Sequence, residues 1–214
     1  MSAATSARLA LQGRHVRLEP LTLDHLDALS EIATGDRSTF DYTPIPIDRA
    51  SLTTYLEKAG EARREGRQVP FATRRLADDR VVGSTRFYDL ETWDWSSSLP
   101  GDEAGRSGPG PDVANIGYTW LAPEAQRSPV NSEAKLLMLG HAFEVWHTRV
   151  VRIQTDARNE RSRRAIERLG CRLDGIIRAD RPAADGGVRD TALYSMLAEE
   201  WPAARRRLVA RLGG

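Results

Sequence analysis

A long amphipathic helix pattern between two strand patterns is the feature that most restricts how this chain can fold. Over residues 132–146 apolar side chains recur at spacings of three and four, which is typical of a helix with one buried face: Leu136, Leu139, Phe143 and Trp146. Residues 113–121 alternate like a strand and stop before Pro123, and residues 150–155 have the composition of a buried strand. We therefore expect layers of helix packed on sheet.

The rest of the chain continues this mixture. Strand patterns cover residues 15–19, 69–75, 81–88, 172–178 and 189–197, and helix patterns cover 22–34, 48–64, 159–169 and 199–212. Turn residues at 77–80 and 185–187 make their flanking strands antiparallel neighbours. The order predicts an α/β or α+β class with a mixed, mainly antiparallel sheet. For the helix over 132–146 we expect Asn131 or Ser132 as the N-cap.

Length and composition favour one folded domain over residues 1–214. With 214 residues and 40% hydrophobic residues, the chain has enough apolar mass for a core. Between residues 96 and 112, 11 of 17 residues are Ser, Pro or Gly, so this stretch is expected to be a flexible insertion between strands.

Charge and cysteine content argue against several classes of protein. The net charge is +1, so no overall field draws the chain to nucleic acid or to an anionic membrane. The apolar run Leu136 to Leu139 is far below the roughly 20 residues that span a bilayer. A single cysteine, Cys171, and the lack of a signal-peptide pattern favour the cytoplasm.

Two segments have the composition of a ligand site. Residues 122–131 lead from a strand to the start of the helix over 132–146, and a helix start offers free amides and about half a positive charge to an anion. Asn159 and Ser162 lie three residues apart at another helix start, so they share a face. Taken separately, each segment is also what an ordinary capped helix looks like.

Taken together, the two segments resemble the GNAT superfamily of N-acyltransferases, in particular its RimJ/RimL-like branch. The resemblance covers most of the chain. The residues that carry it are Val16–Leu21, Ile116–Leu121, Gln126, Asn159, Ser162, Glu167, Leu169–Cys171, Asp174–Gly175 and Arg189–Ser195. It implies a sheet of about seven strands in which the fourth and fifth, residues 113–121 and 150–155, splay apart to admit acyl-CoA.

The resemblance also implies which residues hold acetyl-CoA. The pantetheine arm would pair with backbone near Trp120 and Leu121, and Asn159 and Ser162 would bind that arm or its sulfur. Arg164 would reach a CoA phosphate, although an exposed surface arginine is the simpler interpretation. The pyrophosphate would lie on the loop and helix start formed by Gln126, Arg127, Ser128, Val130, Asn131 and Ser132.

The loop over residues 126–131 departs from the family pattern. The family usually places glycines here, so that backbone amides approach the pyrophosphate closely. This loop has no glycine, and Pro129 lacks an N–H. Side chains of Arg127, Ser128 and Asn131 would have to compensate, so the departure bears on CoA affinity more than on the fold.

The implied reaction is direct attack of a neutral amine on the thioester, with CoA thiolate leaving. A backbone N–H near Leu121 would stabilise the oxyanion. Ser162 would meet the departing thiolate. Asp180 lies about where Rim-type enzymes keep a carboxylate, but an ungapped count falls on Arg181, and a surface aspartate is the competing interpretation.

The acceptor that the resemblance implies is a primary amine, most simply a peptide N-terminus or a small molecule. Residues 89–112 hold six acidic side chains with Trp93 and Trp95, which would suit a cationic amine; a solvated linker is the alternative. A different donor such as succinyl-CoA, and a non-catalytic GNAT-fold module, stay open.

Other ligands have little support in the sequence. No metal site is expected, because His141 and His147 lie six residues apart on one helix. Nucleic-acid binding is not expected either, because Glu160 and Glu167 interrupt the arginines of residues 158–168. A homodimer through the exposed edge of the final strands is left open.

Overall fold

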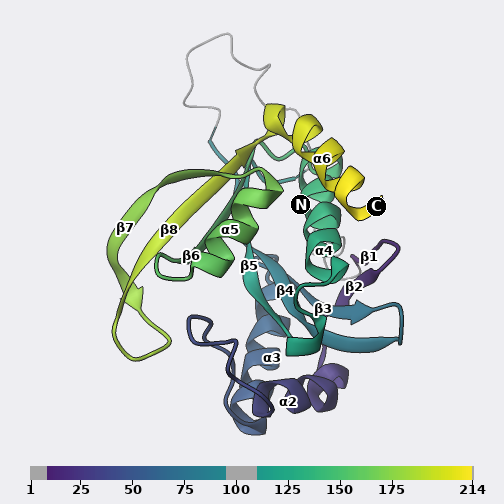
Figure 1. Cartoon of the computed structure of the whole chain (residues 1–214), viewed down its shortest axis with the longest axis vertical. Coiled ribbons are helices and arrows are strands. Elements are labelled where there is room, and N and C mark those ends of the chain that lie inside the picture. Colours follow the sequence, from purple (N-terminus) through teal and green to yellow (C-terminus); the bar gives the residue numbers. More distant parts are fainter. Residues whose placement is uncertain (1–8, 95–109, 214) are drawn as a thin grey trace.

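The computed structural model describes residues 9–94 and 110–213 (Figure 1). Its centre is one sheet of eight strands in the order β1-β2-β3-β4-β5-β6-β8-β7. The strands are β1 (Leu11–Gln12), β2 (Val16–Pro20), β3 (Val69–Arg75), β4 (Arg80–Glu91), β5 (Val113–Leu121), β6 (Val150–Asp156), β7 (Arg172–Pro182) and β8 (Val188–Leu197). All neighbours are antiparallel except β5 and β6, which are parallel.

Helices cover both faces of this sheet. They are α2 (Leu26–Thr34), α3 (Arg49–Arg64), α4 (Pro129–Gly140), α5 (Glu160–Leu169) and α6 (Trp201–Gly213). Short 3-10 turns precede α2, α4 and α6 at Leu23–His25, Pro123–Ala125 and Ala198–Glu200. The fold is therefore a mixed α/β arrangement, as the sequence predicts.

The two faces carry separate apolar cores. One core includes Leu52 and Leu56 of α3 with Trp120 of β5, and the other includes Met138 of α4 with Leu121 of β5. Trp120 and Leu121 are consecutive, so the strand alternation places them on opposite faces. The sheet is thus buried between α2 with α3 on one side and α4, α5 and α6 on the other.

Glu133 in the first turns of α4 holds the N-terminal hairpin of β1 and β2. Its carboxylate accepts hydrogen bonds from the backbone amides of Arg14, His15 and Val16, at 2.8, 2.6 and 2.8 Å. Gly13 lies so close that a Cβ there would be 2.4 Å from Glu133 Cδ. The carboxylate therefore fixes the start of α4 against one end of the sheet.

The structure corrects three details of the sequence prediction. The N-cap of α4 is Ser128, whose hydroxyl accepts from the Val130 amide at 3.3 Å, and not Asn131 or Ser132. Pro129 at the first helical position suits this earlier start, because the amide that proline lacks would be unpaired there. The helix ends in a π-helical turn over His141–Val145, and β1 was not predicted.

Residues 95–109 lie outside the described residues. They comprise Trp95 and most of the insertion predicted over residues 96–112. In the described part of the chain, no helix is both long and apolar enough to span a membrane.

Candidate functional site

β5 and β6 separate halfway along β5. Their parallel pairing runs from Val113 opposite Val150 to Ile116 opposite Ile153 and goes no further, although β5 continues to Leu121. The edge of residues 117–121 that faces β6 is consequently left without a strand partner.

A β-bulge in β5 accounts for this separation. Gly117 pairs with Arg86 of β4 and Trp120 pairs with Ser84, so two residues of β5 stand opposite one residue of β4. Tyr118 within the bulge has a φ of 50°, in the left-handed region. A bulge bends its strand and increases the local twist, which turns the end of β5 away from β6.

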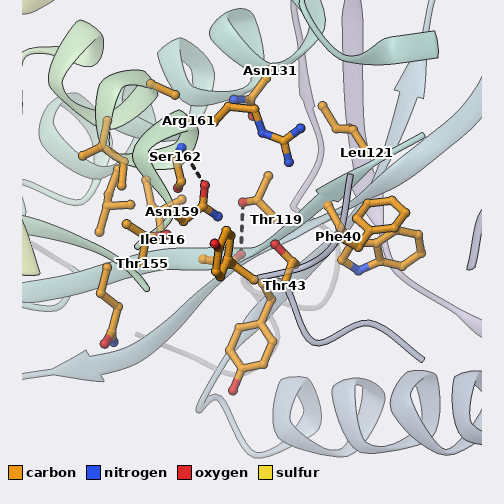
Figure 2. A pocket seen from close by; sticks show the side chains of 18 of the residues that line it. Phe40, Thr43, Ile116, Thr119, Leu121, Asn131, Thr155, Asn159, Arg161 and Ser162 are labelled. Atoms are coloured by element: carbon orange, nitrogen blue, oxygen red, sulfur yellow. Dashed lines mark hydrogen bonds between the residues drawn. The ribbon is translucent and has the colours of Figure 1, made fainter. Parts of the chain in front are cut away.

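The gap opens into a cavity of about 650 Å³. Its walls come from β5, β6 and α5, from the loop before α4, from residues 39–44 and from the β7–β8 hairpin. Of the sequence-predicted residues it brings together Trp120, Leu121, Gln126, Arg127, Asn131, Asn159 and Ser162. Figure 2 shows Asn159 and Ser162 on one side of this cavity with Thr119 facing them and Asn131 beyond.

The other predicted residues do not line the cavity. Ser128 caps α4 and donates to the Ala125 carbonyl at 2.6 Å, Val130 is part of the core, and Ser132 lies on the next turn. Arg164 is exposed and pairs with Glu160 at 2.6 Å, which fits the surface interpretation. These residues contribute to the fold around the site more directly than to its walls.

One end of the cavity has the features of an anion site. The start of α4 points there, with Arg127 beside it, and Arg127 has a φ of 57°. Glycine adopts this left-handed conformation at a lower energetic cost than other residues, and here an arginine adopts it. The side-chain oxygen of Asn131 is buried and has no hydrogen-bond partner among the described residues. An unpaired buried acceptor is the kind of group that a ligand donor satisfies.

A bridge of polar contacts closes the same end. Gln126 donates to the Thr39 hydroxyl at 2.8 Å and to the Leu121 carbonyl at 3.0 Å. Arg161 of α5 donates to Gln126 at 3.1 Å and to the Thr39 carbonyl at 2.5 Å. This bridge ties α5 to the loop before α4 and to the segment after α2. Sequence reasoning missed Thr39, which belongs to a loop far away in the chain.

Asn159 and Ser162 form the start of α5. Asn159 is the N-cap, and its side-chain oxygen accepts from the Ser162 amide at 3.0 Å. Capping uses the side-chain oxygen of Asn159 and the backbone amide of Ser162, whereas the Asn159 amide group and the Ser162 hydroxyl take no part in it, and both residues line the cavity. The capping and ligand interpretations of this pair are compatible, because they use different atoms.

The floor of the cavity contains a buried lysine that sequence reasoning also missed. Lys135 of α4 is 5% exposed and donates to the hydroxyls of Thr85 at 2.9 Å and Thr119 at 2.7 Å. Burial lowers the pKa of this lysine to about 7. The sequence does carry a signal, because Lys135 lies four residues before Leu139 and hence on the apolar face of the helix.

Asp180 is held away from the cavity. Its carboxylate accepts from Thr191 at 2.7 Å and from Arg181 at 2.6 Å, and these contacts lower its pKa. A carboxylate with a lowered pKa and two donors is a weak proton acceptor. Of the two catalytic candidates from the sequence, Ser162 lines the cavity and Asp180 does not.

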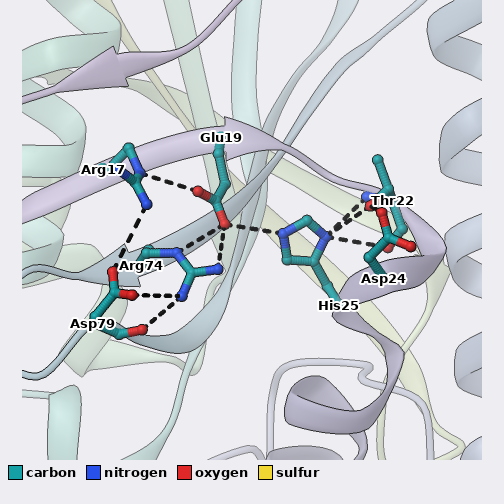
Figure 3. A network of polar contacts seen from close by, with 7 residues as sticks. All are labelled: Arg17, Glu19, Thr22, Asp24, His25, Arg74 and Asp79. Atoms are coloured by element: carbon teal, nitrogen blue, oxygen red, sulfur yellow. Dashed lines mark hydrogen bonds and ion pairs between the residues drawn. The ribbon is translucent and has the colours of Figure 1, made fainter.

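A second polar cluster lies at the β2–β3 side of the sheet and shares no residue with the cavity (Figure 3). Glu19 is its centre and accepts from Arg74 at 2.7 Å, from Arg17 at 3.0 Å and from His25 at 3.1 Å. His25 Nδ1 accepts from the Thr22 amide at 3.1 Å, which leaves the Nε2 proton for Glu19. Both carboxylate oxygens of Glu19 therefore accept hydrogen bonds from neighbouring side chains.

Among the described residues there is no group of three or more His, Cys, Asp or Glu side chains that could hold a metal ion. The chemistry available in the cavity is that of amide, hydroxyl, guanidinium and amine groups.

Comparisons with known proteins agree with this geometry. A family model described as an acetyltransferase (GNAT) domain matches residues 15–172. A GCN5-related N-acetyltransferase from Brucella melitensis is 30% identical, with a TM-score of 0.78 over 96% of this chain and 86% of that one. RimJ from Mycobacterium smegmatis, solved in complex with CoA-disulfide, is 23% identical, with a TM-score of 0.74 over 92% and 88%. A ribosomal-protein-S5-alanine acetyltransferase from Vibrio fischeri is 13% identical, with a TM-score of 0.69 over 90% and 98%. No match was found among curated proteins.

Proposed function

The chain belongs to the GNAT acetyltransferase family, and from this premise we propose that it transfers an acetyl group from acetyl-CoA to a primary amine. The acceptor is a small molecule or a peptide N-terminus, and both substrates are bound before transfer. The observation that carries the proposal is the cavity in the gap between β5 and β6, which runs to the start of α4. A cytoplasmic location, which the single cysteine favours, is part of the same proposal.

The walls of the cavity suit the chemical parts of CoA. Pantetheine carries amide groups, and the unpaired edge of residues 117–121 offers backbone donors and acceptors to them. The pyrophosphate is an anion, and the α4 start with Arg127 is the matching site. Asn131, Asn159 and Ser162 supply side-chain hydrogen bonds between these two regions.

The backbone of β5 provides a donor for the developing oxyanion. The Ala122 amide donates to Val82 of β4 at 2.8 Å. Alternate amides of a strand point to opposite edges, so the Leu121 amide points toward the gap. A donor fixed at that position stabilises negative charge on the thioester oxygen as the amine attacks.

Transfer then proceeds by direct attack. The amine nitrogen bonds to the thioester carbon, its proton passes to a base or to water, and the C–S bond breaks. The Ser162 hydroxyl donates a hydrogen bond to the leaving CoA thiolate. Holding the two substrates in line contributes ~7 to 11 kcal/mol to lowering the barrier.

The test is calorimetric titration with acetyl-CoA at low salt, for the wild type and for an Asn131→Ala, Ser162→Ala double variant. We expect binding by the wild type and at least tenfold weaker binding by the double variant. Thr54→Ala, on the exposed side of α3, is the control and should bind like the wild type. Thiol release in the presence of a panel of amines then tests transfer. Binding with no thiol release from any amine would favour a non-catalytic module, and absence of binding would contradict the proposal.

A further inference from the structure

Lys135 is a buried amine with no ion-pair partner among residues 9–94 and 110–213. Its ammonium donates to two neutral hydroxyls, those of Thr85 and Thr119, and burial is the cause of its lowered pKa, with no charged partner contributing. An ion pair would hold such a lysine in its charged form, whereas isolation in an apolar surrounding favours the neutral amine.

Thr119 connects this amine to the cavity. It is one of the two residues of the bulge, beside Tyr118, and it lines the gap where β5 has left β6. Its hydroxyl is 2.7 Å from Lys135 Nζ. Thr119 Oγ1 also lies 2.8 Å from Thr85 Oγ1. A threonine hydroxyl both donates and accepts, so it passes a proton from one neighbour to another.

We propose that Lys135, in its neutral form, accepts the proton released by the acceptor amine, through the hydroxyl of Thr119. This inference rests on the proposed acetyl transfer. As the amine nitrogen bonds to the thioester carbon, its N–H proton passes to Thr119 Oγ1 while the Thr119 hydroxyl proton passes to Lys135 Nζ. The products are the amide, CoA thiolate and a Lys135 ammonium, and the ammonium later returns its proton to solvent by the reverse path.

The groups around Lys135 are compatible with this role. Thr85 faces it from β4, and Thr119 faces it from β5. On its own helix, Glu133 is the nearest acid in sequence, but its carboxylate is occupied by the amides of residues 14–16. Arg127 and Arg161 line other parts of the same cavity, and burial is the cause of the lowered pKa of the lysine.

The chain offers a matched control for the test, because Lys58 is the only other lysine in the sequence and it is exposed on α3. With ¹³C-labelled lysine, NMR titration of the wild type should give two Cε signals. One should titrate near pH 7 and disappear in Lys135→Met, and the other should disappear in Lys58→Met, which assigns the two signals. A Lys135 signal that does not titrate between pH 6 and pH 8 would overturn the proposal.

The kinetic arm uses thiol release with an amine that titrates outside pH 5.5–9. In the wild type we expect kcat to rise with pH through an apparent pKa near 7. Lys135→Met and Thr119→Val should each lower kcat by about 10²–10³-fold and remove this rise, while acetyl-CoA affinity stays within about threefold. Thr119→Ser keeps the hydroxyl and should keep most of the activity, and Lys58→Met should match the wild type.

The outcomes separate this inference from the proposed function. If Lys135→Met remains folded and keeps wild-type kcat and its pH dependence, the proton path is wrong while acetyl transfer stands. If the variant loses acetyl-CoA binding in the same proportion as activity, Lys135 only shapes the cavity and the path is likewise wrong. If the wild type itself neither binds acetyl-CoA nor releases thiol, both proposals fail.

Discussion

Glu19 shows how one side chain makes this fold sensitive to acid. Burial alone would raise the pKa of this carboxyl, but hydrogen bonds from Arg74 and His25, together with the charge of Arg74, outweigh burial and lower the pKa to about 2. A carboxyl whose pKa is lower in the folded than in the unfolded chain stabilises the fold above its unfolded pKa. Here that contribution is complete above about pH 4.5 and is lost as the pH falls toward 2.

We therefore expect Glu19→Gln to lower the free energy of unfolding at pH 7 by about 1–2 kcal/mol, after allowance for solvent screening of the partly exposed group. The difference from the wild type should shrink between pH 4.5 and pH 2. Urea denaturation across this pH range measures it. Glu160→Gln removes the exposed pair with Arg164 and should stay within about 0.5 kcal/mol of the wild type at every pH. If Glu19→Gln lowered the free energy of unfolding equally at every pH, the side chain would stabilise the fold through its packing and not through its charge.

Single residues of the site could be predicted from the sequence only where their role is local. Asn159 and Ser162 could be singled out because a helix start leaves a local signal, and both residues line the cavity, while their role in binding a ligand stays a prediction. Lys135 and Thr119 lie 16 residues apart on different elements, and their contact depends on how α4 packs against the bulge in β5. No spacing rule encodes that contact.

At the scale of elements, the start of α4 depends on Glu133 as much as on the Ser128 cap. Replacing Glu133 by Ala would leave the amides of residues 14–16 without their acceptor inside the fold. Unpaired buried amides cost about 1–3 kcal/mol each, with water offsetting part of the loss where it enters.

We expect Glu133→Ala to lower the free energy of unfolding by about 2–4 kcal/mol and to increase amide exchange across residues 11–20. Glu133→Gln should recover part of this, because it keeps one acceptor oxygen. Glu124→Gln, an exposed acid just before α4, is the control and should change stability by less than about 0.5 kcal/mol. Unchanged exchange over residues 11–20 in Glu133→Ala would contradict the anchoring role.

Element boundaries followed the strength of the local signal. The strand over residues 113–121 and the end of α5 at Gly170, which has a φ of 103°, match the prediction, because alternation and a left-handed glycine are local features. The predicted start of α4 was wrong, because Ser128, Asn131 and Ser132 are all suitable N-cap residues and only packing selects among them. The separation of β5 from β6 came from the family resemblance, since the bulge that causes it has no mark in the sequence.

At the scale of the whole molecule, the gap divides the sheet into two parts. β1 to β5 lie on one side and β6 to β8 on the other, and pairing across the boundary extends only from Val113 opposite Val150 to Ile116 opposite Ile153. A ligand that fills the gap contacts both parts of the sheet, so its binding also stabilises their association. A ligand that binds only the folded state at 100 times its Kd stabilises it by about 2.7 kcal/mol.

Hydrogen exchange with acetyl-CoA tests whether the ligand bridges the two parts. We expect slower exchange at residues 117–121 on one side of the gap, at residues 153–155 on the other and at the start of α4, because the cavity is lined by all three. Adenosine 3′,5′-bisphosphate lacks pantetheine, so it should protect the start of α4 and leave both strands unchanged. The Asn131→Ala, Ser162→Ala variant at the same acetyl-CoA concentration is the control for ligand occupancy. If acetyl-CoA protected only the helix start, the cofactor would lie outside the gap, and the separation of β5 from β6 would not serve to bind it.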